Sequence, residues 1–243
     1  MRGLAFSRFS LQGVLVLEQK KPIDATIPAR PAPRETLQDY VYLQVKDLIM
    51  NGEIEPGRTI TIQSLAAAFS VSHMPVREAL HRLTAERALA VVGGRSVGIP
   101  ALSLERLEDL RRVRSEVEGL AAAWAAERID AATLDRLEEL HHALDDAVAD
   151  GDVKRYLRAN RELHFGVYDA AGSPTLRALI EPLWLQISPY FNHLRGSGNY
   201  AKSNTCHRAL IDALRARNPE EARRAVQADI AAASEILKSM IGK

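Results

Sequence analysis

The sequence predicts a mainly α-helical protein in two parts, in which three short helices and a β-hairpin precede a bundle of six antiparallel helices. Three observations support this prediction. Alanine and leucine are abundant whereas aromatic residues make up only 5% of the chain, a composition that favours helices. Apolar residues follow helical spacing from residue 36 onward, and the period changes at residues 89–99.

The first three predicted helices lie between residues 36 and 86. Thr36 is a predicted N-cap, and Asn51-Gly52 ends the helix that follows it. A second short helix is expected at residues 62–69. Ser72 is predicted to cap a third helix that runs to about residue 86. Pro75 is compatible with this helix because N–H groups of a first turn lack helical partners.

The helical period then gives way to that of a β-hairpin. Residues 89–92 and 96–99 are short apolar runs, and Gly93-Gly94-Arg95 between them predicts a tight turn. Three helices followed by such a hairpin indicate a winged helix-turn-helix, which we assign to residues 35–102. Residues 1–34 contain four prolines and no sustained period, so a flexible N-terminal arm is expected there.

Residues 103–243 are expected to form an all-helical domain. Ser103 is the predicted cap of a long helix that ends near residue 129. Thr133 is the predicted start of the next helix, which Asp150-Gly151-Asp152 interrupts. Later helices are expected at about 153–171, from Ser173-Pro174, at 201–217 and from Asn218-Pro219. Six helices with short connections predict an antiparallel bundle.

Residues 64–80 have the pattern of a DNA-reading helix-turn-helix. The core Pro-Val-Arg-Glu-Ala-Leu at 75–80, with Gly-Glu-Ile-Glu-Pro-Gly upstream at 52–57, resembles the GntR family of bacterial regulators. This resemblance spans about residues 36–100. It implies that the third helix enters the major groove of double-stranded operator DNA. We call the winged helix-turn-helix at residues 35–102 the reading head. Because a palindromic operator needs two reading heads, a homodimer is expected.

The residues expected to contact DNA lie at the start of the third helix and at the hairpin tip: Ser72, His73, Met74, Arg77 and Arg95. Arg77 is the leading candidate because a guanidinium can bind guanine O6 and N7 bidentately. An ion pair with Glu78 or Glu86 is the alternative for Arg77, and a solvated turn residue is the alternative for Arg95. The chain departs from the family pattern at His73 and Met74, where Arg and Thr are usual, and at Arg87, where glycine is usual.

The six-helix part resembles the FCD ligand-binding domain of one GntR subfamily, over about residues 104–240. Arg114 and Glu118 match an Arg and a Glu spaced i, i+4 on the first helix of that domain. The metal fingerprint of the domain falls here on Asn160, His164, His207 and Asp229. Two imidazoles and a carboxylate suit a divalent metal, with Zn first and Mn, Ni or Fe as alternatives, and Asn adds a neutral oxygen.

The same resemblance implies a small carboxylate effector beside the metal. Arg114 is the candidate effector contact because a buried guanidinium can bind a carboxylate through two hydrogen bonds. An intrahelical salt bridge with Glu118 is the alternative, and the two can coexist. For His164 and His207 the alternative is an ordinary buried or interfacial histidine, and a metal-free sensor of fatty acyl thioesters is a further alternative. The other histidines singled out are expected on helix surfaces or loops: His141, His142 and His193.

These features predict a DNA-binding transcription regulator, and more narrowly a repressor, rather than an enzyme. A metal-dependent hydrolase is disfavoured because the sequence has no Gly-rich phosphate loop and no Gly-x-Ser-x-Gly elbow. The net charge is only +1, but DNA binding needs only a local basic face. A single cysteine, Cys206, and the lack of any apolar run of about 20 residues indicate a cytoplasmic protein without a membrane segment.

Overall fold

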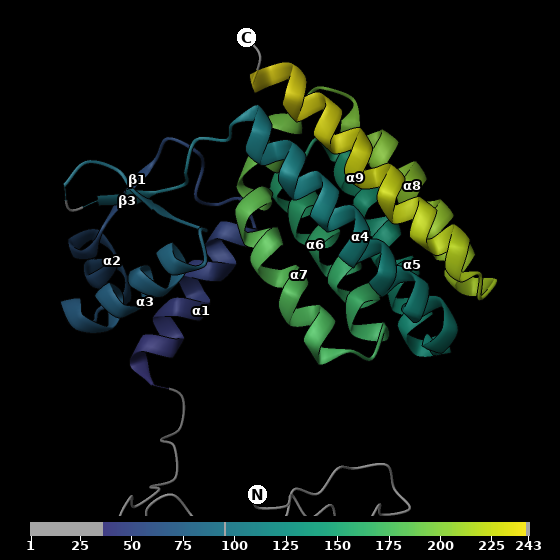
Figure 1. The fold of residues 1–243 in the computed structure, drawn as a ribbon, viewed down its shortest axis with the longest axis horizontal. Helices are drawn as coiled ribbons and strands as arrows, with labels where there is room; N and C mark the ends of the chain where they lie inside the picture. Colours follow the sequence, from purple (N-terminus) through teal and green to yellow (C-terminus); the bar gives the residue numbers. More distant parts are fainter. Residues whose placement is uncertain (1–35, 95, 242–243) are drawn as a thin grey trace, which may run out of the picture. The chain divides into compact units, whose positions relative to one another are not determined.

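The computed structural model describes residues 36–94 and 96–241 (Figure 1). The N-terminal part of the described chain contains α1 (Leu37–Met50), β1 (Thr59–Thr61), α2 (Ile62–Phe69), α3 (His73–Ala85), β2 (Ala90–Val91) and β3 (Ser96–Gly98). The strands form an antiparallel sheet in the order β1-β3-β2. The predicted winged helix-turn-helix is therefore confirmed. The predicted arm at residues 1–34 and the turn residue Arg95 lie outside the described residues.

A side-chain cap explains where α1 begins. The Thr36 hydroxyl accepts a hydrogen bond from the Asp39 N–H at 3.2 Å, and the Asp39 carboxylate accepts from the Thr36 N–H at 3.4 Å. Such a reciprocal pair satisfies two N–H groups that a helix leaves without partners. Ser72 stands at the N-cap position of α3, but its side chain makes no capping hydrogen bond, so the predicted role holds only for its position.

The end of α3 has a backbone conformation that glycine would adopt most easily. Arg87 has φ 59°, in the left-handed region. The N–H of Arg87 donates to the Thr84 carbonyl, and the N–H of Ala88 donates to the Leu83 carbonyl, each at 3.0 Å. A non-glycine residue in this region costs roughly 1–2 kcal/mol. The buried side chains of Leu83 and Leu89 on either side hold the turn in place despite this cost.

The C-terminal part of the described chain is all helical. It contains α4 (Leu104–Arg128), α5 (Ala131–Asp150), α6 (Val153–Ala170), α7 (Pro174–Ile187), the 3₁₀ helix η1 (Ser188–Leu194), α8 (Asn199–Arg215) and α9 (Pro219–Ile241). Helix α9 lies along both α4 and α8, and α5 lies along α6 (Figure 1). The predicted six-helix bundle is thus confirmed, and its core consists mainly of Leu, Ile, Ala and aromatic side chains. The domain limits at 34/35 and 102/103 stay predictions.

Two helix starts differ from the prediction. Helix α5 begins at Ala131 rather than Thr133, because the Asp130 carboxylate caps it by accepting from the Thr133 N–H at 2.7 Å. Helix α8 begins at Asn199, directly after Gly198, which has φ 78°. Among the described residues, no helix combines the length and the apolar character needed to cross a bilayer.

Candidate functional site

Three of the predicted metal ligands meet inside the helical bundle. His164 comes from α6, His207 from α8 and Asp229 from α9. The Nε2 atoms of the two histidines are 3.1 Å apart, and Asp229 Oδ2 lies 3.3 Å from His164 Nε2 and 3.8 Å from His207 Nε2. One potential ligand atom of each residue therefore points at a common centre, although the residues are far apart in the sequence.

The spacing and protonation of this cluster fit a divalent metal. Ligands held about 2.0–2.2 Å from a tetrahedral ion lie about 3.4 Å from one another, close to the three distances here. Burial lowers the pKa of His207 to about 3, which leaves an imidazole lone pair available at neutral pH. Burial alone would raise the pKa of Asp229, but the carboxylate lies beside His164, His207 and the Ser203 hydroxyl, which together lower its pKa to about 2. The cluster thus presents the nitrogen lone pair of His207, the imidazole of His164 and one carboxylate.

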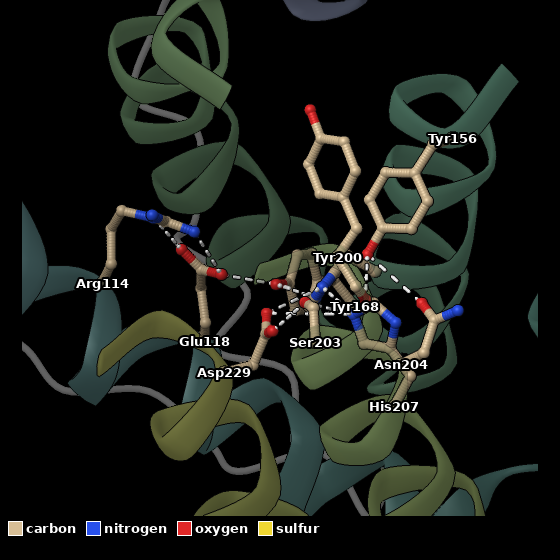
Figure 2. Close-up of polar contacts among 10 residues, drawn as sticks. Arg114, Glu118, Tyr156, Tyr168, Tyr200, Ser203, Asn204, His207 and Asp229 are labelled. Atoms are coloured by element: carbon tan, nitrogen blue, oxygen red, sulfur yellow. Dashed lines mark hydrogen bonds and ion pairs between the residues drawn. The ribbon is translucent and has the colours of Figure 1, made fainter. Parts of the chain in front are cut away.

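Two further polar side chains border the cluster. The Ser203 hydroxyl, one helical turn before His207, donates to Asp229 Oδ1 (Figure 2). Asn160 is buried one turn before His164 and, together with Ser203, Asp229 and Phe191, lines a hollow of about 20 Å³. This volume is room for about one water molecule. The hollow in this conformation is therefore too small for an organic acid.

Arg114 lies in the bundle core and is paired with Glu118 on the same helix. Its Nε donates to Glu118 Oε1 at 2.6 Å and its Nη2 donates to Oε2 at 3.3 Å (Figure 2). The same Oε2 accepts a hydrogen bond from the Tyr168 hydroxyl at 2.5 Å. The intrahelical salt bridge named as the alternative for Arg114 is therefore present, and among the described residues no hydrogen bond uses Nη1.

The predicted DNA-contacting residues that the structure describes lie on one exposed end of α3. Ser72, His73, Met74 and Arg77 are all exposed, whereas the core-facing stripe of the helix is buried. Among the described residues Arg77 has no ion-pair partner. Glu86 instead accepts from the Tyr42 hydroxyl at 2.9 Å and pairs with Arg82. The proposed ion pair of Arg77 is thus not formed.

Sequence reasoning missed part of the site and misplaced one histidine. Tyr168 and Ser203 were not singled out, although each stands four residues from a ligand histidine and so shares its helix face. His141 is 6% exposed, so placing it on the surface was wrong. Its Nε2 lies 3.0 Å from the Asn204 carbonyl oxygen, because α5 packs against α8 at this point. His142 beside it is exposed, as expected.

A winged helix-turn-helix joined to an all-helical C-terminal domain indicates the class of DNA-binding transcription regulators. Residues 37–99 match the description "Bacterial regulatory proteins, gntR family", and residues 109–232 match "FCD domain". The chain belongs to the GntR family of transcription regulators and carries an FCD domain.

Similar proteins agree with this assignment. The HTH-type transcriptional regulator McbR of Escherichia coli is 30% identical over 182 residues, which are 74% of this chain and 82% of McbR. Its solved structure covers 86% of this chain and 97% of its own, with a TM-score of 0.73 and 28% identity. The uncharacterized regulator YdhC of Bacillus subtilis is 25% identical (82% of this chain, 90% of YdhC). The transcriptional repressor NanR of Cronobacter sakazakii is also 25% identical (84% and 86%).

Proposed function

We propose that this regulator is a homodimeric repressor whose operator binding responds to a small carboxylate bound beside a divalent metal in the FCD domain. The observation that carries the proposal is the convergence of His164, His207 and Asp229 within 4.8 Å of one another in the bundle core. A buried carboxylate is costly unless its charge is compensated, and a bound cation would compensate the charge of Asp229. The regulator itself is proposed to catalyse no reaction.

In this proposal His164, His207 and Asp229 hold the metal, and Asn160 supplies a fourth, neutral oxygen. Mixed nitrogen and oxygen ligands suit Zn first, with Mn, Ni or Fe as alternatives. When bound, the metal supplies open coordination positions for oxygen atoms of an effector. The burial of Asn160 beside the same hollow as Asp229 supports this role.

A small organic acid is the proposed effector because the centre offers positive charge to an anion. Arg114 is the proposed second contact, through the Nη1 that its salt bridge with Glu118 does not use. The hollow has room for only about one water molecule, so an acid can enter only if the surrounding helices move. Such a movement is what regulation requires, because a ligand shifts an equilibrium only if it prefers one conformation.

The 3₁₀ helix η1 is the proposed route from the effector to the reading head. Phe191 lines the hollow. On either side of it, the Tyr190 hydroxyl donates to the carbonyl of Pro100 in the linker, and Asn192 Nδ2 donates to the carbonyl of Gly52, just after α1, at 2.7 Å. Displacement of Phe191 would therefore move two contacts of the reading head.

On DNA, Arg77 is proposed to read a guanine, while Ser72, His73, Met74 and Arg95 contact neighbouring bases or phosphates. The exposure of Ser72, His73, Met74 and Arg77 supports this proposal. Two copies would read the two halves of a palindromic operator. The name of NanR as a repressor favours repression here as well.

The test is a gel-shift titration of the metal-loaded protein on its own promoter region, with and without a panel of organic acids, neutral sugars and acyl thioesters. We expect a carboxylic acid alone to change the operator affinity. A response to acyl thioesters that persists after metal removal would instead favour the metal-free alternative. Loss of any DNA binding would contradict the assignment of the reading head.

A further inference from the structure

A continuous chain of buried polar groups leads from Arg114 to the ring of His164. Arg114 donates two hydrogen bonds to Glu118, and the Tyr168 hydroxyl donates to Glu118 Oε2 at 2.5 Å. The Nδ1 of His164 lies 3.1 Å from the Tyr168 hydroxyl oxygen. These four side chains are between 0% and 4% exposed, so bulk water does not compete for their hydrogen bonds.

The direction of each hydrogen bond follows from the number of protons available. A phenol has one proton, and the Tyr168 oxygen lies 2.5 Å from Glu118 Oε2 but 3.1 Å from His164 Nδ1. Tyr168 therefore donates that proton to Glu118, the nearer acceptor and a charged one. Its oxygen can then only accept from the ring of His164. The Nδ1 of His164 consequently carries a hydrogen.

We infer that Tyr168 and Glu118 are positioning residues for the metal: they fix the tautomer of His164 so that Nε2 is the ligand atom. This inference rests on the proposed metal site. A neutral imidazole with its hydrogen on Nδ1 has its lone pair on Nε2. That nitrogen faces His207 Nε2 at 3.1 Å and Asp229 Oδ2 at 3.3 Å. Ligand histidines usually donate their other N–H to an oriented acceptor, and losing it typically costs 10–100-fold in metal affinity.

The role of Arg114 follows from the same arrangement. Its two hydrogen bonds hold the Glu118 carboxylate in one orientation and balance its charge in the core. Its guanidinium carbon also lies 5.4 Å from the ring centroid of Trp184, and Trp184 packs against His164 with 5.2 Å between ring centroids. Arg114 thus supports the ring of His164 both through Glu118 and through packing.

The two ligand histidines differ in this respect. Within residues 36–94 and 96–241, the buried Nδ1 of His207 has no hydrogen-bond partner. The chain of hydrogen bonds through Glu118 and Tyr168, called the relay below, therefore acts on His164 alone. A measurement that resolves both rings can use His207 as an internal reference for effects that spread through the whole domain.

The test compares Tyr168→Phe with Tyr42→Phe in the full chain. Tyr42 lies on α1 outside the helical bundle and is 5% exposed, and its hydroxyl also donates to a glutamate, Glu86 Oε2, at 2.9 Å. Zn²⁺ affinity is measured by competition with a chromophoric chelator. We expect Tyr168→Phe to weaken Zn²⁺ binding about 10–100-fold, and Tyr42→Phe to change it less than threefold.

Histidine tautomers are read in the same proteins from two-bond ¹H–¹⁵N correlations of ¹⁵N-labelled imidazoles. The Zn²⁺-loaded wild type should show a hydrogen on Nδ1 of His164 and a metal on its Nε2. Should the hydrogen be found on Nε2, the relay would be overturned, even if Tyr168→Phe failed to fold. Equal affinities of the two Phe variants would also overturn it. Failure of the wild type to bind Zn²⁺ would instead overturn the metal site itself.

Discussion

The Nε2 atoms of His164 and His207 lie 3.1 Å apart, although the two residues are on different helices and 43 positions apart in the sequence. Two nitrogen lone pairs facing each other at this distance repel unless a proton or a cation lies between them. Together with Asp229, the pair makes metal content the first property to measure.

Protein purified without a chelator or a nickel column is expected to contain about one divalent metal per subunit, because the three ligand atoms converge in the core. His207→Ala should lose the metal, and chelation should lower the Tm of the wild type but not of this variant. Elemental analysis and thermal unfolding provide the measurement. The exposed His142→Ala is the control and should keep its metal. Unchanged metal content in His207→Ala would rule out this ligand set.

The metal-free protein is expected to lose stability as the pH falls. The pKa of His207 is about 3 in the folded chain and 6.5 for an ordinary histidine, so between these values only the unfolded chain binds the proton. Asp229, with a pKa of about 2 against 3.8, adds a loss in the same direction between pH 3.8 and 2. Denaturant unfolding at several pH values should therefore give a falling free energy of unfolding below about pH 6.5. His207→Asn should flatten this slope between pH 6.5 and 5, and an unchanged slope would contradict the assignment.

Arg77→Ala is expected to weaken operator binding by about 1–3 kcal/mol, because the exposed guanidinium is placed to bind a base edge. Gel-shift titrations at one fixed salt concentration give the comparison. Arg112→Ala removes the same charge from an exposed position of α4 and serves as the control. If both variants bind the operator like the wild type, Arg77 is not a DNA contact.

Arg87→Gly is expected to stabilise the reading head by about 0.5–1 kcal/mol. Glycine relieves the strain of φ 59°, although it also increases the entropy of the unfolded chain. The contrasting variant is Arg217→Gly, where φ is 50° but the guanidinium donates to the carbonyls of Glu127 and Ile129 at 3.1 and 2.9 Å. Arg217→Gly should stabilise less or destabilise. Chemical unfolding measures the free energy of unfolding of both variants. Destabilisation by Arg87→Gly would refute the strain argument.

Tyr190→Phe is expected to leave DNA affinity unchanged without effector and to reduce the effector response at least severalfold. The reason is that its hydroxyl contacts the carbonyl of Pro100 in the linker. Operator titrations with and without the acid found in the screen measure both quantities. Tyr40→Phe, an exposed tyrosine of α1, is the control. A full effector response in Tyr190→Phe would exclude this contact from the route.

The sequence alone determined the architecture of both parts. Capping residues such as Thr36 and Ser103, the proline at position 174 and the glycine pair 93–94 act within a few residues of themselves. Local signals of this kind survive without tertiary contacts, so the helix order and the hairpin could be predicted. Asn160 and His164, one helical turn apart, could be placed on one face for the same reason.

Tertiary structure alone decided which side chains meet. The sequence could not show that Tyr168 bridges Glu118 and His164, because its contact with Glu118 joins α6 to α4 across the core. It also could not reveal that His141 is buried against α8, or that the hollow beside Asp229 has a volume of about 20 Å³. Helical periodicity fixes the direction of a side chain relative to its own helix. Distances between helices follow from how all their side chains pack together.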